Sequence, residues 1–276
     1  LSELERSIRA AYQVPNDVIA LIKQFPRDAD PIDVLRTAVS ALEFYDHDAR
    51  NLSREASVKT AIKLTAQFPT LVAAADRIRR GLEPVAPAGS MNIAANFLYQ
   101  LQGERPSEHD ARIFDVCLIL HADHELNAST FTARVVAGTL ADMYASVTAA
   151  IGALSGPLHG GANTNVMKTL LEIGEVENVE PYIKKALAEK RKIMGIGHAV
   201  YKTEDPRATW LRKFSQTMGE KKGDMSWFNM SQKIEKAMLE KKGMYPNVDF
   251  YSASAYYLMD IPLDRVIRLT AMVPKV

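Results

Sequence analysis

The sequence predicts an almost entirely α-helical fold, and three observations support that prediction. Apolar residues recur at spacings of three and four along most of the chain. Residues that cap helices stand directly before several of these apolar patterns. No run of alternating β-branched residues bounded by turn residues is present, so we expect few or no strands. Short turns are expected to join the helices.

Helix starts are marked by a capping side chain directly before an apolar pattern. In the clearest one, Asp30 is the cap, Pro31 is the first helical residue, and apolar residues recur through Leu42. Aspartate and serine side chains accept hydrogen bonds from the free N–H groups of a first turn, and proline lacks the N–H there. The predicted starts, in chain order, are Asp30-Pro31, Ser53, Ser107 with Asp110 three residues later, Asp205-Pro206 and Ser226.

Breaks between helices are expected where proline and glycine occur at short spacing. Proline in a helix interior removes a backbone hydrogen bond, and glycine adopts the conformations that end helices. These positions are Pro69, 81–87, 103–106, 156–157, 195–197 and 243–246. The last three turns lie next to chemically reactive side chains, which suits a cleft that opens and closes.

The stretch from Val135 to Leu158 contains a single charged residue, Asp142. It is long enough to cross a bilayer. Most of its residues are small, however, and small residues favour close packing between helices over contact with lipid. We therefore predict one helix, buried inside the protein or at a subunit interface, and no membrane span.

The composition is that of a soluble globular protein. Of 276 residues, 47% are hydrophobic and 24% are charged, and the formal net charge is +1. A near-neutral chain gives no electrostatic reason to expect nucleic acid or an anionic membrane as a partner. The single cysteine, Cys117, excludes an internal disulfide and fits a reducing compartment, so we expect a cytoplasmic protein. The chain begins at Leu1 without a starting methionine, and we expect further residues at both ends.

Four of the six histidines stand in unusual surroundings, whereas His47 and His109 lie among charged residues and are expected at the surface. His121 and His124 are three residues apart, beside two acidic residues, and would share a helix face. Their spacing differs from the usual zinc pattern and no second ligand-rich cluster occurs, so we predict no metal site. A polar helix end that lines a pocket is the preferred interpretation.

His159 lies in the segment Gly-Pro-Leu-His-Gly-Gly, just before an apolar pattern, and is therefore expected near a helix N-terminus. The helix dipole favours a neutral imidazole at that position. A neutral histidine can donate one hydrogen bond to a carbonyl oxygen, as a catalytic donor would. A turn histidine that only caps the helix is the alternative.

The segment from Gly195 to Arg207 combines glycines with His198, Lys202 and a cap. Glycines let the backbone approach a ligand closely. A dinucleotide-binding loop is excluded, because the third glycine and the strand–helix–strand context are absent. Arg207 lies in a first helical turn, where the dipole disfavours a cation, and its planar fork suits a carboxylate. A solvated arginine paired with a nearby acid is the alternative.

Asp249 lies in the segment Tyr-Pro-Asn-Val-Asp-Phe-Tyr, among apolar and aromatic residues. A carboxylate in such surroundings can accept a proton from a substrate and so act as a base. The alternative is an ordinary turn or helix cap.

In their order and wording these segments resemble the citrate synthase family. The matching strings are His-Ala-Asp-His-Glu with Asn-Ala-Ser (121–129), Gly-Pro-Leu-His-Gly-Gly-Ala-Asn (156–163), the segment 195–207, the segment 245–252 and Asp-Val-Leu-Arg-Thr-Ala-Val-Ser-Ala-Leu (33–42). The resemblance implies a homodimer, or a higher oligomer of dimers, of all-α subunits. Each subunit would have a large domain (1–158, with 255–276 returning to it) and a small domain (159–254) that closes over a cleft.

The resemblance also implies the reaction and the residues that perform it. Acetyl-CoA, a co-substrate and not a permanently bound cofactor, would condense with oxaloacetate to give citrate and CoA. Asp249 would take a proton from the acetyl methyl group, His159 would hydrogen-bond the thioester oxygen, and His198 would polarise the oxaloacetate carbonyl. The implied substrate ligands are His124, Arg207, Asn127 and Asn247, and the implied CoA-binding residues are Gly195, Ile196, Gly197 and Lys202.

Two alternatives stay open at this point. A 2-methylcitrate synthase would use propionyl-CoA, and one extra methylene is worth only about 1–3 kcal/mol of discrimination, so the motifs do not decide. A catalytically silent relative is the other alternative. It is suggested because the arginine that should bind a substrate carboxylate after Ile261-Pro262 is missing, and Arg265 and Arg268 are out of register.

Overall fold

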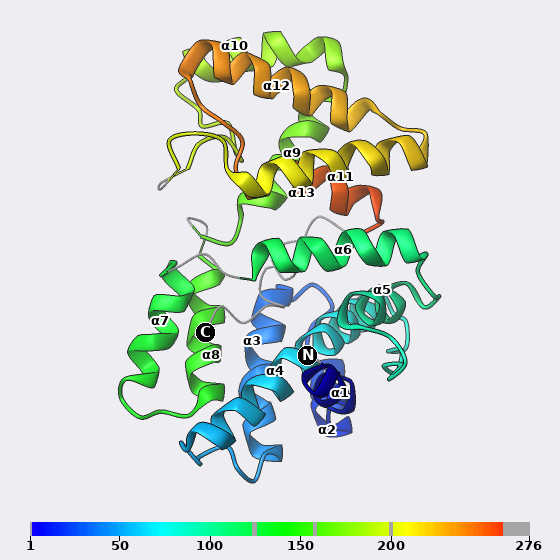
Figure 1. The fold of residues 1–276 in the computed structure, drawn as a ribbon, viewed down its shortest axis with the longest axis vertical. Coiled ribbons are helices and arrows are strands. Elements are labelled where there is room, and N and C mark those ends of the chain that lie inside the picture. The colour runs from blue at the N-terminus through cyan, green and yellow to red at the C-terminus, as the bar shows by residue number, and fades with distance from the viewer. Residues whose placement is uncertain (1, 123–125, 157–158, 199–200, 262–276) are drawn as a thin grey trace. The chain divides into compact units, whose positions relative to one another are not determined.

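The computed structural model describes residues 2–122, 126–156, 159–198 and 201–261 (Figure 1). Within these ranges every regular element is helical, apart from one antiparallel β-bridge between Ile196 and Pro246. Short 3₁₀ turns cover Glu43–Tyr45 and Val176–Asn178. The α-helices are α1 (Ser2–Ala10), α2 (Asn16–Lys23), α3 (Pro31–Leu42), α4 (Arg54–Arg79), α5 (Ile93–Gln102), α6 (Glu108–His121), α7 (Ala128–Ala137), α8 (Met143–Leu154), α9 (Ala162–Ile173), α10 (Val179–Ala188), α11 (Pro206–Lys222), α12 (Ser226–Lys242) and α13 (Val248–Leu258).

The backbone divides into two compact units. The first unit contains the described residues up to His159, and the second contains those from Gly160 onward. In the first unit α3, α4, α5, α6 and α8 form the packed centre, whereas in the second α13 packs against α9 and α11. The predicted boundary between residues 254 and 255 falls inside α13, which lies wholly in the second unit. The domain assignment itself stays a prediction.

Most predicted helix starts are confirmed by a cap bond from the expected side chain. Four such side chains each accept a hydrogen bond from a backbone N–H of the following first turn, which is the bond that a free helix N-terminus lacks. The bonds are Ile32 N to Asp30 Oδ1 (3.0 Å), Ala56 N to Ser53 Oγ (3.3 Å), Asp110 N to Ser107 Oγ (3.1 Å) and Arg207 N to Asp205 Oδ1 (3.0 Å).

The predicted helix start at Ser226 is confirmed, because Ser226 is the first residue of α12. Its backbone N–H donates to Asp224 Oδ1 at 3.0 Å, and its hydroxyl donates to the same oxygen. The acceptor at this helix start is therefore the Asp224 carboxylate, and a charged acceptor is a strong one at a helix N-terminus.

The predicted break at Pro69 is wrong, because α4 continues through it to Arg79. All residues from 66 to 74 are buried, so this part of α4 is covered on every side. Proline in a helix interior costs about 3 kcal/mol, whereas each large apolar side chain buried here contributes about 1.5–3 kcal/mol. Packing therefore outweighs the lost backbone bond. The glycine and proline stretches 81–87, 103–106, 195–197 and 243–246 do lie between helices, as predicted.

The stretch from Val135 to Leu158, predicted as one helix, contains the last residues of α7 and the whole of α8, and these two helices lie side by side (Figure 1). Leu158 lies outside the described residues. Asp142, the one charge in the stretch, caps α8 by accepting the N–H of Ala145 at 2.9 Å. Leu140 lies between them with a φ of +64°. A side chain that accepts first-turn N–H groups ends the continuous helix, and hydropathy alone does not reveal it. Among the described helices none combines the length and apolar character that crossing a bilayer requires.

In the second unit α13 is the most deeply buried helix. Every residue from 250 to 256 is buried, including Phe250, Tyr251 and Tyr256. Ser254 reaches Ser215 of α11 at 2.7 Å between hydroxyl oxygens. The helix that follows Asp249 is therefore held by the core, and its first turn is partly open to solvent.

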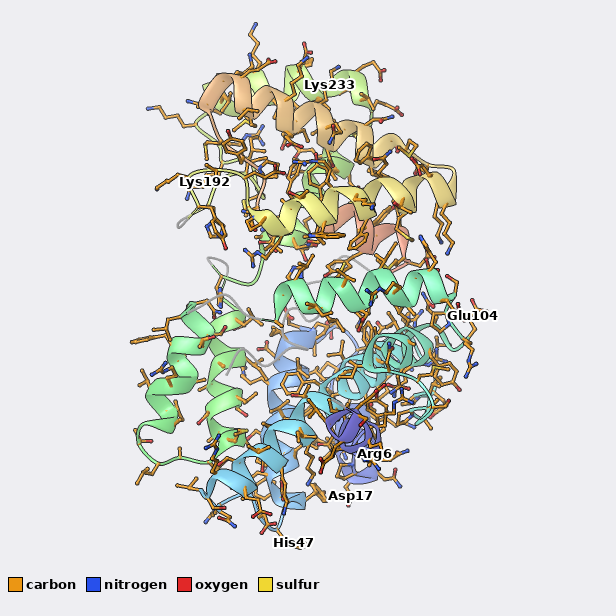
Figure 2. The ribbon with its side chains drawn as sticks, viewed as in Figure 1. Arg6, Asp17, His47, Glu104, Lys192 and Lys233 are labelled. Carbon is orange, nitrogen blue, oxygen red and sulfur yellow. The ribbon has the colours of Figure 1, made fainter. Side chains whose placement is uncertain are left out.

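Charged side chains lie mainly on the surface of each unit, as the side-chain view indicates (Figure 2). Arg6, Asp17 and Glu104, labelled there, are all exposed. His47 and His109 are exposed as predicted. The charge patterning of the sequence thus separates surface from core correctly at these positions.

Candidate active site

In the first unit, His159 is held by the start of α7. Its Nε2 lies 3.3 Å from the backbone N of Ser129 and 3.0 Å from the Ser129 hydroxyl. Since a backbone N–H can only donate, Nε2 accepts this bond, and a neutral ring then carries its proton on Nδ1. The ring therefore presents Nδ1–H as a hydrogen-bond donor.

Asn127 organises the same region by capping α7. Its Oδ1 accepts bonds from the backbone N of Ser129 (3.1 Å), the backbone N of Thr130 (3.0 Å) and the Ser129 hydroxyl (2.7 Å). Its Nδ2 is buried and has no hydrogen-bond partner among the described residues. A buried donor without a partner carries a free-energy cost, which a bound acceptor such as a carboxylate oxygen would remove.

In the second unit, His198 follows the glycine turn and its Nδ1 accepts the backbone N–H of Tyr201 at 3.1 Å. A neutral ring with Nδ1 occupied in this way carries its proton on Nε2. Burial lowers the pKa of His198 below its usual value, the Asp205 carboxylate opposes that shift, and the Arg207 guanidinium adds to it. The neutral form is thereby favoured, with Nε2–H as the donor.

Arg207 is bound by Asp205 through two parallel bonds, Nε to Oδ1 (3.0 Å) and Nη2 to Oδ2 (2.8 Å). The Asp205 side chain is completely buried, and that of Arg207 is 12% exposed. Burial alone would raise the pKa of Asp205, but the bonds from Arg207 hold it below its usual value. This pair fixes the plane of the guanidinium and leaves Nη1 for another acceptor.

Asp249 lies in the first turn of α13, half-buried, and its backbone N–H donates to Asn247 Oδ1 at 3.0 Å. Asn163, in the first turn of α9, donates from Nδ2 to the Asp249 carbonyl (3.1 Å) and to the Ser252 hydroxyl (2.5 Å). The backbone that carries the Asp249 carboxylate is therefore fixed from two sides.

The glycine turn 195–197 is bound to the segment before α13. Gly197 N donates to Tyr245 O at 2.7 Å, and Asn247 N donates to Gly195 O at 2.9 Å. These bonds form the β-bridge between Ile196 and Pro246. Much of the turn's backbone hydrogen-bonding capacity is thus used inside the protein, while Lys202, farther along the loop, is exposed.

The predicted site residues fall into two groups, one in each unit, and one of them lies outside the described residues. His198, Arg207, Asn247, Asp249 and the glycine turn belong to the second unit, whereas Asn127 and His159 belong to the first. His124 lies outside the described residues.

Sequence reasoning assigned no site role to Ser129, Asp205 and Asn163, which hold His159, Arg207 and Asp249 respectively. A signal existed for Asp205, because an acid at a helix cap two residues before an arginine can reach its guanidinium.

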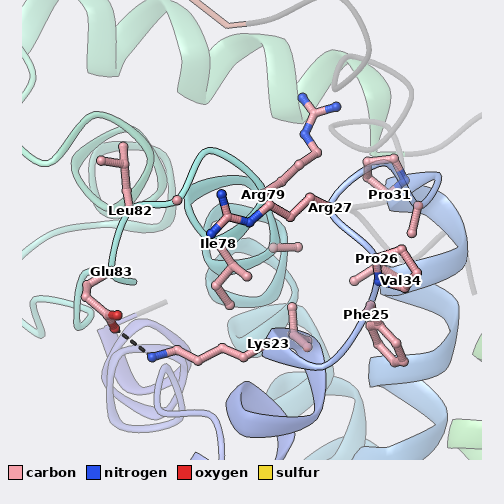
Figure 3. A pocket seen from close by; sticks show the side chains of 14 residues that line it. Lys23, Phe25, Pro26, Arg27, Pro31, Val34, Ile78, Arg79, Leu82 and Glu83 are labelled. Carbon is pink, nitrogen blue, oxygen red and sulfur yellow. Dashed lines mark hydrogen bonds and ion pairs between the residues drawn. The ribbon is translucent and has the colours of Figure 1, made fainter.

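The cavities described here are lined by other residues. One, of about 230 Å³, lies between α2, α3 and α4 of the first unit, with the ion pair of Lys23 and Glu83 (2.6 Å) at its edge (Figure 3). The other lies between α10 and α12 of the second unit, and lysines line much of it. Neither of these two cavities contains a predicted site residue.

Comparison with known proteins decides the family. The family described as citrate synthase, C-terminal domain, matches residues 1–273. The chain belongs to the citrate synthase family. The predicted family, all-α fold and enzyme class, an acyl-converting transferase, are confirmed by this match.

Individual relatives agree with the family assignment. Citrate synthase 2 of Bacillus subtilis (strain 168) is 51% identical over 265 residues, which cover 96% of this chain and 71% of the relative. The citrate/2-methylcitrate synthase of the same organism is 40% identical over 264 residues, covering 95% of this chain and 71% of the relative. The ternary complex of the Thermoplasma acidophilum citrate synthase with carboxymethyl coenzyme A and oxaloacetate has a TM-score of 0.91 at 28% identity, covering 99% of this chain and 73% of that one.

Proposed function

We propose that this chain carries the condensing activity of a citrate synthase, in which acetyl-CoA, oxaloacetate and water give citrate and CoA. The observation that carries the proposal is the 51% identity to a citrate synthase over 96% of the chain. The presence of one carboxylate and two donor histidines supports it, because the chemistry needs those groups. We place the reaction in the cytoplasm, which fits the single cysteine.

The base in this proposal is Asp249. A thioester α-proton is weakly acidic, so a carboxylate removes it only if the enolate oxygen is stabilised as it forms. The methyl proton passes to the Asp249 carboxylate, and the electron pair of the C–H bond moves toward the thioester oxygen. The fixed backbone of Asp249, bonded through Asn247 and Asn163, supports this role, because a base must be held at a defined position.

Two histidines supply the hydrogen-bond donors. Nδ1–H of His159 stabilises the thioester oxygen, and Nε2–H of His198 polarises the ketone of oxaloacetate and then protonates its oxygen. Each donor is worth about 3–4 kcal/mol, by analogy with a single oxyanion-hole donor. The new carbon–carbon bond gives a citryl thioester, which water cleaves to citrate and CoA. The hydrogen bonds at His159 Nε2 and His198 Nδ1 support these assignments.

Binding of the dicarboxylate is assigned to groups with remaining donors. Asn127 offers a buried Nδ2, and Arg207 offers Nη1. His124 is added to these dicarboxylate ligands because of the resemblance to the family. Lys202 and the turn Gly195, Ile196, Gly197 are assigned to CoA, with the exposed ammonium directed at its phosphates.

The partner of this chain is proposed to be a second copy of it, bound through α7. Several large apolar residues along α7 and its flanking turns are 54–77% exposed, and apolar surface of this kind marks interaction sites. They are Leu126, Phe131, Val135 and Leu140. The two units are proposed to act as the large and small domains of each subunit, with the active site completed when they close.

The test replaces the base and compares it with a matched carboxylate. Asp249→Asn keeps the shape and the backbone cap bond, and it is expected to lower kcat at least a hundredfold, because a general base contributes about 10²–10⁴. Asp33→Asn, at an exposed position in the first turn of α3, is expected to change kcat less than twofold. The measurement is oxaloacetate-dependent thiol release from acetyl-CoA by the complete natural polypeptide.

Three outcomes separate the interpretations. Loss of turnover in Asp249→Asn at an unchanged melting temperature supports the assignment. Normal turnover in Asp249→Asn refutes it. A folded wild-type protein that neither turns over nor binds oxaloacetate in calorimetric titration refutes the enzymatic proposal and indicates a silent relative.

Propionyl-CoA is the second candidate substrate, favoured by the 40% identity to a citrate/2-methylcitrate synthase. The acyl pocket must then accept one extra methylene, which changes the preference by about 1–3 kcal/mol. The ratio of kcat/KM for acetyl-CoA to that for propionyl-CoA decides between the two.

A further inference from the structure

The side chain of Asn247 joins two segments that are far apart in the sequence. Its Oδ1 accepts the backbone N–H of Asp249 at 3.0 Å, and its Nδ2 donates to the carbonyl oxygen of Gly197 at 2.9 Å. Both ends of the amide are thus engaged inside the protein. The substrate-binding role predicted for Asn247 would have to use the second Nδ2 hydrogen or the second lone pair of Oδ1.

The surrounding backbone reinforces this connection. The β-bridge pairs Ile196 with Pro246 through two short backbone bonds, and Gly197 has a φ of +91°. A Cβ placed on Gly195 would lie 3.0 Å from the Cα of Phe250. The turn is therefore packed against the first turn of α13.

The two residues that this connection carries are the ones with proposed chemical roles. His198 follows Gly197 directly, and Asp249 lies in the first turn that Asn247 caps. We propose that Asn247 is a positioning residue that sets the ketone-polarising His198 relative to the base Asp249. The inference rests on the proposed function, since it explains how two groups of that reaction are placed within one unit.

The proposal explains why an amide is needed at this position. Serine or aspartate would cap α13 as well as asparagine does. Neither reproduces the second bond: serine is too short to span both segments, and a carboxylate cannot donate to the Gly197 carbonyl. Substitution by these residues therefore removes the bridge and retains the cap.

The experiment uses this difference in the complete natural polypeptide. Asn247→Ser is expected to lower kcat at least tenfold, with the KM values for acetyl-CoA and oxaloacetate changed less than threefold. Asn247→Asp, which caps strongly and so keeps the fold, is expected to show the same loss. The matched control is Asn92→Ser on α5, where Oδ1 caps Ala95 at 2.8 Å, and kcat is expected to stay within twofold.

A second readout separates positioning from a general loss of structure. In an His198→Ala background, Asn247→Ser is expected to lower kcat less than twofold further, because the group to be positioned is gone. Equal losses in both backgrounds would overturn the inference, as would an Asn247→Ser enzyme as active as the Asn92→Ser control. Wild-type protein without any condensing activity would instead refute the proposed function, and the inference with it.

Discussion

Gly195→Ala is the substitution for which the structure makes the sharpest prediction. Gly195 has a φ of +75°, in the left-handed region that residues with a Cβ rarely adopt. A Cβ at this position would lie 2.6 Å from Cγ2 of Val166, 2.9 Å from Cδ2 of Phe250 and 3.0 Å from Cα of Phe250. The last contact is with backbone, which moves less readily than a side chain.

The expected cost has two parts. The left-handed backbone costs about 1–2 kcal/mol for a residue with a Cβ. Insertion of a methyl group into a packed core costs about 1–3 kcal/mol more, so the total is about 2–5 kcal/mol. Gly243→Ala is the matched control: its φ is +62°, but no atom lies within 4 Å of the added Cβ. The control should therefore lose only the backbone contribution to the free energy of unfolding, about 1–2 kcal/mol.

Tryptophan fluorescence during urea unfolding measures the effect in the right place. Both tryptophans of the chain, Trp210 and Trp227, lie in the second unit with Gly195. The free energy of unfolding from this signal should fall about 1–3 kcal/mol further for Gly195→Ala than for Gly243→Ala. The turnover number should fall as well, since Phe250 directly follows the proposed base.

Equal destabilisation by the two alanines would refute this reasoning. That result would mean that Val166 and Phe250 can move away from the added Cβ without a loss of stability. The glycine turn would then not be tightly packed against α13. Loss of stability in Gly195→Ala without any change in kcat would refute the link between this packing and the position of Asp249.

Two further predictions concern the partly buried bond of Tyr144 and the partly buried ring of His198. Tyr144→Phe removes the 2.5 Å hydrogen bond from the tyrosine hydroxyl to the Asp46 carboxylate. The free energy of unfolding, measured in urea, should fall by about 1.5–3 kcal/mol. Tyr182→Phe, which removes an exposed hydrogen bond, is the control and should lower it far less. A similar cost for both would contradict the role of burial. Because burial lowers the pKa of His198, the unfolded chain binds a proton that the folded chain does not, and stability should fall as pH drops below about 6.5. The His198→Gln variant should lose less free energy of unfolding than the wild type over that pH range. If urea titrations gave the two proteins the same pH dependence, the lowered pKa of His198 would be contradicted.

Much of the fold was predictable because its signals are local. Asp30 before Pro31 and Asp205 before Pro206 each bind a backbone N–H within two residues, so neighbouring residues suffice to recognise a helix start. The helix start at Ser226 is local in the same way, since its N–H is accepted by Asp224, two residues earlier.

Longer-range packing accounts for the remaining differences in the fold. Pro69 stays inside α4 because residues around it are buried on all sides, which depends on helices distant in the sequence. The turn between α7 and α8 depends on Asp142, whose capping role competes with the even hydropathy of the stretch. Hydropathy and spacing do not reveal which of these competing preferences prevails.

The candidate site shows the same division between local and tertiary information. Three reactive side chains stand out in the sequence because they lie beside turns: His159, His198 and Asp249. The sequence segments around them resemble those of one family. The residues that hold them were not assigned such roles. Ser129 contacts a histidine 30 positions away, and Asn163 contacts a helix 86 positions away.

By itself, then, the sequence determined the helical class, most helix starts, the family and the reactive side chains, because these depend on neighbouring residues or on an ordered set of motifs. Only the tertiary structure decided that Asn247 spans from Gly197 to Asp249, that Ser129 holds His159 and that Asn127 Nδ2 has no partner among the described residues. The physical reason is that a hydrogen bond depends on distances of about 3 Å between atoms, and chain segments reach those distances only when the core packs.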